Sequence, residues 1–110
     1  MPDRIIVLVD ANNVRRSQWP NIPDDELVER VRRWASHEGV EALIVFDGRA
    51  PVEAHDVVGA GRESADDWIA REAAQLARYW LVTSDRELRD RAGGAAERVI
   101  GGGTFARELP

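Results

Sequence analysis

The sequence contains no cysteine and no lysine, and each absence excludes a class of chemistry. Without cysteine, the chain has no disulfides, no thiolate metal ligands and no cysteine nucleophile. Without lysine, the phosphate-binding lysine of a P-loop and Schiff-base catalysis are excluded as well. All 15 basic residues are therefore arginines, a bias that we attribute to genomic base composition.

Long apolar runs are also missing. No run approaches the ~20 residues of a membrane span, and the start of the chain lacks a signal peptide, so we expect a cytoplasmic protein with no membrane partner. The formal net charge of −5 argues against a basic nucleic-acid coat, although an acidic site could still act on nucleic acid. With 44% hydrophobic and 32% charged residues, the chain is expected to fold as one domain, residues 1–110.

Short apolar runs alternate with helical patterns along the chain. Residues 5–9 are five consecutive branched aliphatics, which is typical of a central strand in a parallel sheet. We predict a polar loop at residues 15–23 and no helix after the glycine run 101–103. The alternation predicts an α/β fold of three layers, with helices on both faces of a parallel sheet of about five strands. The predicted strands are residues 5–9, 42–46, 57–58, 79–83 and 99–100, and the predicted helices are residues 24–38, 64–77 and 85–92.

Aspartates gather where these predicted strands end. Asp10, Asp47 and Asp85 each follow a predicted strand, and Asp66 and Asp67 begin a predicted helix. Because the carboxyl ends of parallel strands share one edge of the sheet, these side chains are expected to converge in one pocket. A group of carboxylates without lysine favours a hard divalent cation, Mg²⁺ or Mn²⁺, and such ions promote hydrolysis of phosphate esters by activating water.

Each of these aspartates also has a structural interpretation. Asp67 fits a capping box with Ser64, and Asp66 would favour the positive end of the same helix. Asp85 could be a helix N-cap and Asp47 a turn residue. Asp10 has the weakest structural alternative, since no helix is predicted to start at it. The coincidence of all five at one edge is what favours a functional site.

Polar and basic residues flank the aspartates. Loop formation and helix capping are the alternatives to a role of the polar ones in orienting water or phosphate. Trp19, in the polar loop, could stack on a base, whereas the other three tryptophans lie on apolar faces. The candidates for contacts to a substrate are Asn12, Asn13, Thr83 and Ser84, and Arg15, Arg16, Arg49 and Arg62 could contact a phosphate backbone.

Five short stretches form an ordered set along nearly the whole chain. They are residues 9–14 (VDANNV), 45–48 (VFDG), 64–69 (SADDWI), 82–85 (VTSD) and 103–109 (GTFAREL). This set resembles the NYN domain family, and within it the YacP-like ribonucleases of the PIN-like nuclease group. The resemblance implies a PIN-like fold with strand order 3-2-1-4-5 and a metal-dependent endoribonuclease site.

Carried over position by position, the resemblance implies that Asp10, Asp66 and Asp85 bind the metal, with Asp67 and Asp47 as further catalytic candidates. Asn12 or Asn13 matches the polar position after the first aspartate, and Thr83 and Ser84 match the hydroxyl pair before the last. Ala11 and Asn12 replace the Gly-Tyr that YacP-like members more often have, so a stacking tyrosine is absent. The chain also ends soon after residues 103–109, before the C-terminal extension of longer members.

Our interpretation is a metal-dependent endoribonuclease with Mg²⁺ or Mn²⁺ as cofactor, and a toxin of a toxin–antitoxin pair is a variant of it. The expected partner is RNA, either mRNA or tRNA and in some settings at the ribosome, and a homodimer is a further expectation. An aspartyl-phosphate phosphatase would need an acid at Asn12 and a lysine, and a receiver domain also needs a lysine. A PIN-like module that binds RNA or protein without cutting it stays open as the alternative.

Overall fold

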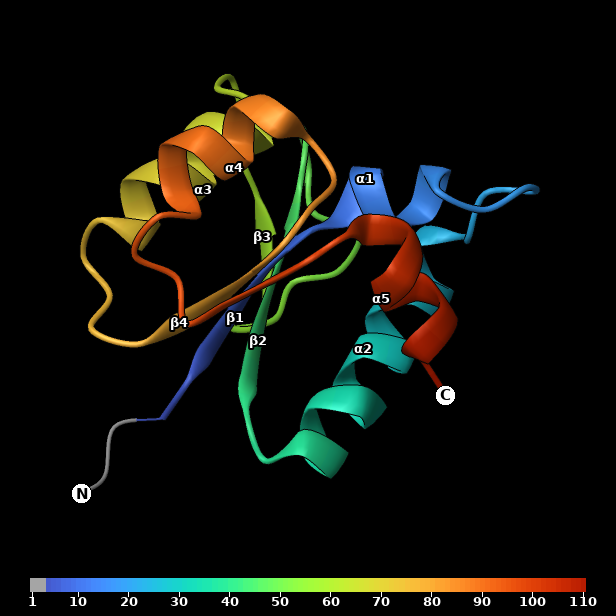
Figure 1. The fold of residues 1–110 in the computed structure, drawn as a ribbon. Coiled ribbons are helices and arrows are strands. Elements are labelled where there is room, and N and C mark those ends of the chain that lie inside the picture. The colour runs from blue at the N-terminus through green and yellow to red at the C-terminus, as the bar shows by residue number, and fades with distance from the viewer. Residues whose placement is uncertain (1–3) are drawn as a thin grey trace.

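The computed structural model describes residues 4–110, which form a central sheet between two layers of helices (Figure 1). The helices α1, α2 and α5 cover one face of the sheet, and α3 and α4 cover the other. None of the helices in this part of the chain is long and apolar enough to cross a membrane. The elements follow in the order β1 (Ile6–Asp10), α1 (Ala11–Arg16), α2 (Asp24–Glu38), β2 (Glu41–Phe46), β3 (Val57–Gly59), α3 (Ala65–Ala73), β4 (Tyr79–Val82), α4 (Arg86–Ala92), β5 (Arg98–Ile100) and α5 (Gly102–Glu108).

The sheet has five parallel strands in the order β3-β2-β1-β4-β5, which confirms the predicted topology and the α/β, PIN-like fold class. Strand β1 lies at the centre, paired with β2 on one side and β4 on the other. The chain therefore reverses its direction of winding between β1 and β4. In an open α/β sheet, the carboxyl ends of the strands at such a switch point are where ligands bind.

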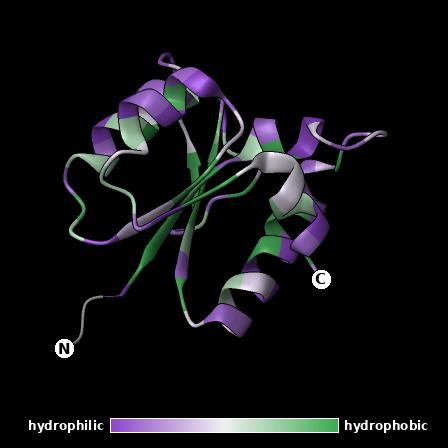
Figure 2. Cartoon of the chain, viewed as in Figure 1, coloured by the Kyte–Doolittle hydropathy of each residue, from purple (hydrophilic) through white to green (hydrophobic). Residues whose placement is uncertain are grey.

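The aliphatic run of β1 is buried on both faces, because successive side chains of a strand point to opposite sides. Val7 and Val9 pack into the core beneath α1, α2 and α5, and Leu8 packs into the core beneath α3 and α4. Figure 2 shows the apolar residues concentrated in the strands and the polar ones on the outer faces of the helices. This two-sided burial fixes β1 firmly and places Asp10 at its carboxyl end.

The structure contains two helices that the sequence did not predict. Helix α1 begins directly after Asp10, where no helix was predicted, and runs into the start of the predicted loop 15–23, and it buries only Ala11 and Val14. Helix α5 begins inside the glycine run and buries Phe105 and Ala106. Both are too short to be stable alone, so packing against the rest of the domain rather than local sequence must stabilise them. Helix α3 also ends at Ala73, earlier than its apolar pattern indicated.

Candidate active site

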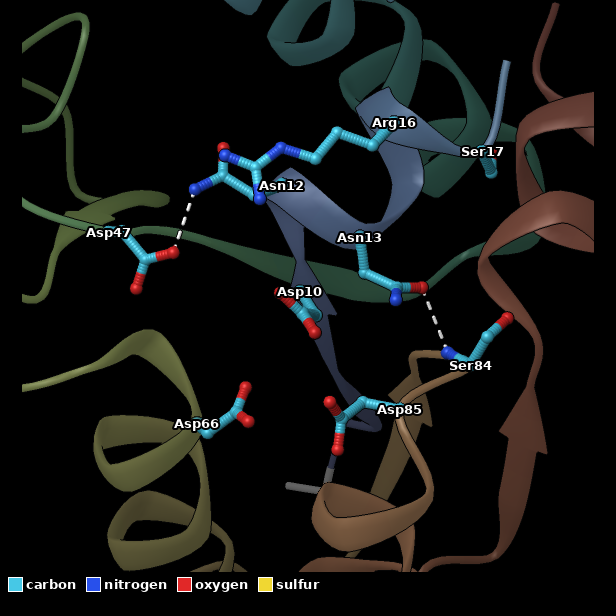
Figure 3. Close-up of a pocket in the computed structure, with 9 residues that line it drawn as sticks. All are labelled: Asp10, Asn12, Asn13, Arg16, Ser17, Asp47, Asp66, Ser84 and Asp85. Carbon is cyan, nitrogen blue, oxygen red and sulfur yellow. Dashed lines mark hydrogen bonds between the residues drawn. The ribbon is translucent and has the colours of Figure 1, made fainter.

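An open cleft of about 410 Å³ lies at the carboxyl edge of the sheet, over the switch point between β1 and β4. Its walls come from the end of β1, from α1, from the loop after β2, and from the starts of α3 and α4. Figure 3 shows the carboxylates of Asp10, Asp66 and Asp85 directed into a common space. The lining residues are Asp10, Asn12, Asn13, Arg16, Ser17, Asp47, Asp66, Ser84 and Asp85.

Asp10 forms the floor of this cleft and is only 5% exposed. It occupies the N-cap position of α1, yet its side chain does not cap the helix. One carboxylate oxygen instead accepts a hydrogen bond of 2.8 Å from the Thr83 hydroxyl. Burial raises the pKa of Asp10 to about 6, and repulsion from Asp66 and Asp47 adds to the rise, while the bond from Thr83 opposes it.

Thr83 lies beneath the cleft, fully buried, and connects two of the aspartates. Its hydroxyl oxygen accepts a bond of 3.1 Å from the backbone N–H of Asp85, which leaves the hydroxyl hydrogen to be donated to Asp10. This direction of donation stabilises the ionised form of Asp10. Thr83 therefore orients the buried carboxylate and holds the start of α4 next to it.

Asp66 and Asp85 face Asp10 from the starts of two helices. Burial raises the pKa of Asp66, and repulsion from Asp85 and Asp47 raises it further. Asp85 is the N-cap of α4, where one of its oxygens accepts the N–H of Leu88 at 2.9 Å and leaves the other free. The capping interpretation of Asp85 is therefore correct, and it does not remove this side chain from the cleft.

Asp47 lies at the edge of the cleft and uses both of its oxygens. One accepts the backbone N–H of Ala65 at the start of α3, and the other accepts the side-chain amide of Asn12, each at 2.8 Å. The side-chain oxygen of Asn12 in turn accepts a hydrogen bond from the guanidinium of Arg15. Asp47 thus connects α1 to α3 across the cleft, and it also stands in the bend before Gly48, as the turn interpretation allowed.

Asn13, Ser84 and Gly102 form a contact that joins three segments on the other side of the cleft. The Asn13 side-chain oxygen accepts the backbone N–H of Ser84 at 2.9 Å, and the Ser84 hydroxyl accepts the N–H of Gly102 at 2.8 Å. A Cβ atom at position 102 would lie 2.2 Å from that Asn13 oxygen, so a larger residue would have to displace the Asn13 side chain and its bond to Ser84. The glycine at position 102 therefore allows α5 to approach α1. Ser84 does not cap α4, because the N-cap of that helix is Asp85.

Several predicted site residues lie outside the lining of the cleft. Asp67 is exposed and forms an ion pair of 2.8 Å with Arg91, while its backbone N–H is capped by Ser64. Arg15 is not in the lining, and its guanidinium bonds the side chain of Asn12 and forms an ion pair with Asp24. Arg49 and Arg62 flank a backbone bridge between Gly48 and Gly61, beside Asp47 but not in the cleft wall.

Ser17 is a lining residue that the sequence analysis missed. Had a helix been predicted from Ala11, the residues at 12, 13, 16 and 17 would have fallen on one face, because neighbours on a helix recur at three and four residues. That face is the one that lines the cleft. Arg15 also follows Asn12 by three residues and bonds its side chain, yet it is not in the lining of the cleft.

The donors of the cleft are oxygen atoms from four aspartates, and among the described residues Arg16 is the only basic side chain in its lining. Such a set fits a hard divalent cation. Among residues 4–110, however, no three acidic or histidine side chains are close enough to enclose an ion by themselves. The set therefore suits an ion that keeps several of its waters, as Mg²⁺ usually does.

No protein-family model and no curated protein matches the sequence. Among solved structures, the crystal structure of a mutant of Rae1 (YacP) from Bacillus subtilis is similar to this chain. The TM-score is 0.72 and the identity 26%, over 94% of this chain and 72% of the other. The chain has a YacP-like fold.

The YacP-like fold confirms the family resemblance and the architecture that it implied. It also agrees with the position of the cleft, since the acidic residues at the ends of β1, β2 and β4 come together as that topology requires. The nuclease activity, the metal and the individual roles of the site residues stay predictions.

Proposed function

We propose that this chain is a metal-dependent endoribonuclease that hydrolyses RNA phosphodiester bonds in the acidic cleft. The observation that carries the proposal is the buried carboxylate of Asp10, which is surrounded by further aspartates and has no cationic partner among residues 4–110. A buried charge without a partner lowers stability, so its presence is best explained by function. The YacP-like fold supports the same conclusion.

In this proposal Asp10, Asp66 and Asp85 hold Mg²⁺ or Mn²⁺. When bound, the ion would activate water and neutralise the charge that develops on the scissile phosphate. The protein's own contribution is positional. Thr83 keeps Asp10 ionised and oriented, and the bridge between Asp47 and Asn12 fixes the amide of Asn12 at the edge of the cleft. Arg16 supplies the positive charge in the lining that can contact a substrate phosphate.

RNA, such as an mRNA or a tRNA, free or at the ribosome, is the proposed substrate. The protein as a whole carries a net charge of −5, so long-range attraction to RNA is weak and the local contacts at the cleft must provide most of the affinity. We therefore expect the affinity to depend strongly on arginines near the cleft.

The test compares neighbouring aspartates of α3. Purified wild type, Asp66→Asn and Asp67→Asn are incubated with single-stranded and structured RNA in Mg²⁺, Mn²⁺ or a chelator. Asp66 lines the cleft and Asp67 pairs with Arg91 outside it, so we expect a loss of about 10²- to 10³-fold in Asp66→Asn and near wild-type cleavage in Asp67→Asn. Asp10→Asn should lose cleavage as Asp66→Asn does.

A non-cleaving module that binds RNA or protein is the second candidate. It is favoured by the lack of any ready-made group of three acidic or histidine ligands in residues 4–110. Under this alternative, wild type and Asp66→Asn would bind RNA equally and neither would cleave it with any of the metals. That result would refute the nuclease proposal.

A further inference from the structure

Trp19 is the most exposed large apolar side chain in the described part of the chain. Its side chain is 91% exposed, compared with 43% for Val52 and 37% for Val99, the other strongly exposed ones. Trp34, by contrast, is buried against Phe105, with ring centroids 4.8 Å apart. An exposed indole loses the favourable burial that tryptophan normally gains, so its position needs an explanation.

The loop that carries Trp19 is closed at its base by Arg15. The backbone N–H of Ile22 donates to the Arg15 carbonyl at 3.2 Å, and the Arg15 guanidinium donates to the Ile22 carbonyl at 2.7 Å. The same guanidinium forms an ion pair of 2.7 Å with Asp24. Trp19 therefore lies in a loop whose two ends are held together, and Figure 1 shows the chain extending outward in a loop after α1. Arg15 serves this loop and is not available for a substrate phosphate.

Arg16, the next residue, is in the opposite situation. It lines the cleft, and its side chain makes no hydrogen bond or ion pair with any residue among 4–110. Figure 3 shows it extended along the edge of the cleft beside Asn12. Ser17, where the loop starts, also lines the cleft. Along the chain, Arg16 with its unpaired guanidinium precedes Ser17, and Trp19 with its exposed indole follows two residues later.

We propose that Arg16 and Trp19 form a subsite for single-stranded RNA next to the cleft, a proposal that rests on RNA being the substrate. Arg16 contacts a phosphate, and Trp19 stacks on an unpaired base of the same strand. Stacking of this kind tolerates any base, because every base has a flat face. In a duplex those faces are covered by the neighbouring base pairs, so Trp19 discriminates against double-stranded RNA.

The experiment measures binding in a chelator, where cleavage cannot interfere. Labelled single-stranded RNA of roughly 10 nucleotides, and the duplex of the same sequence, are titrated by fluorescence anisotropy and by quenching of tryptophan emission. We expect Trp19→Ala to weaken single-strand binding roughly ten- to hundredfold, to abolish most of the quenching and to leave duplex binding unchanged. Trp19→Phe should restore most of the affinity, since phenylalanine also stacks.

Of two further variants, Val52→Ala serves as a control and Arg16→Gln tests the phosphate contact. Val52→Ala removes another exposed apolar side chain and should bind as wild type does. Arg16→Gln should weaken binding to all sequences and reduce the slope of affinity against salt concentration by about one. Trp19→Ala should melt at the wild-type temperature, because its side chain makes little contact with the protein.

The outcomes separate this proposal from the nuclease proposal. Binding of the single strand by Trp19→Ala with wild-type affinity and wild-type quenching would overturn the subsite, even if the wild type cleaves RNA. An equal loss of affinity for single strand and duplex would overturn the discrimination. If Trp19→Ala loses single-strand binding while the wild type cleaves nothing with any metal, the subsite stands and the nuclease proposal falls.

Discussion

Asp56 lies just before β3, an outer strand of the sheet, and Asp10 lies at the carboxyl end of the central strand β1. Asp56 receives two hydrogen bonds, 2.8 and 2.9 Å, from the guanidinium of Arg32, and this partner lowers its pKa. Asp10 accepts the Thr83 hydroxyl and has no arginine partner among residues 4–110, and its burial raises its pKa to about 6. The chain pairs the carboxylate before β3 with a cation and leaves the buried one at the end of β1 without one.

This difference separates a carboxylate that supports the fold from those of the candidate site. A paired carboxylate stabilises the native state, whereas a buried one without a cation destabilises it. Arg91 forms an ion pair with Asp67, as Arg32 does with Asp56, and Asp67 lies outside the cleft lining. Pairing with arginine is thus a structural criterion that distinguishes neighbours such as Asp66 and Asp67.

The largest expected effect on stability is at Asp10. The pKa of Asp10 is about 6 in the folded protein, above its ordinary value of 3.8, so the folded state binds the proton more tightly than the unfolded state does. In a chelator, the free energy of unfolding should therefore rise as the pH falls through 6 and level off below about 4. The pKa difference corresponds to at most about 3 kcal/mol.

Asp10→Asn removes this buried charge, so we expect it to be more stable than the wild type at pH 7.5 in a chelator. Urea unfolding at several pH values measures the difference, which should shrink toward pH 4.5, where Asp10 is largely protonated. If Asp10→Asn is less stable than the wild type at pH 7.5, the charge of Asp10 is not what lowers the stability at the carboxyl end of β1.

The sequence predicted the strands and the acidic edge because both follow from local signals. Branched aliphatic runs indicate buried parallel strands, and the topology then brings Asp10, Asp47 and Asp85 together. It did not predict α1 and α5, whose stability comes from contacts between distant segments. The face of α1 that lines the cleft was therefore missed, together with Ser17.

Gly102 tests how closely the carboxyl edge is packed. At Asp56 the connection is made by the long side chain of Arg32, whereas α5 approaches α1 where Gly102 lies against the side chain of Asn13. Gly102→Ala places a Cβ atom against the side-chain oxygen of Asn13, and we expect a loss of about 1–3 kcal/mol in urea unfolding. Gly103→Ala is the matched control, since its Cβ would meet only ordinary contacts.

A double mutant identifies the contact responsible. Asn13→Ala removes the oxygen and with it the bond to Ser84, at a cost of about 1 kcal/mol. In that background Gly102→Ala should cost much less than it does alone. Equal costs in both backgrounds would show that the close approach to Asn13 is not what requires glycine.

The smallest expected effect is at the start of β3, where Asp56→Asn weakens the pair with Arg32. Both side chains are partly exposed, so we expect a loss of about 1 kcal/mol at pH 7.5. The pH dependence has the opposite sign to that of Asp10. Because the pKa of Asp56 is lowered in the folded protein, its contribution is present above the ordinary value of 3.8 and is lost as the pH falls through the lower folded value. Urea unfolding of wild type and Asp56→Asn at pH 7.5 and below pH 3.8 measures this. A gain in stability for Asp56→Asn at pH 7.5 would mean that Arg32 does not compensate this carboxylate. The contrast between Asp56 and Asp10 would then disappear.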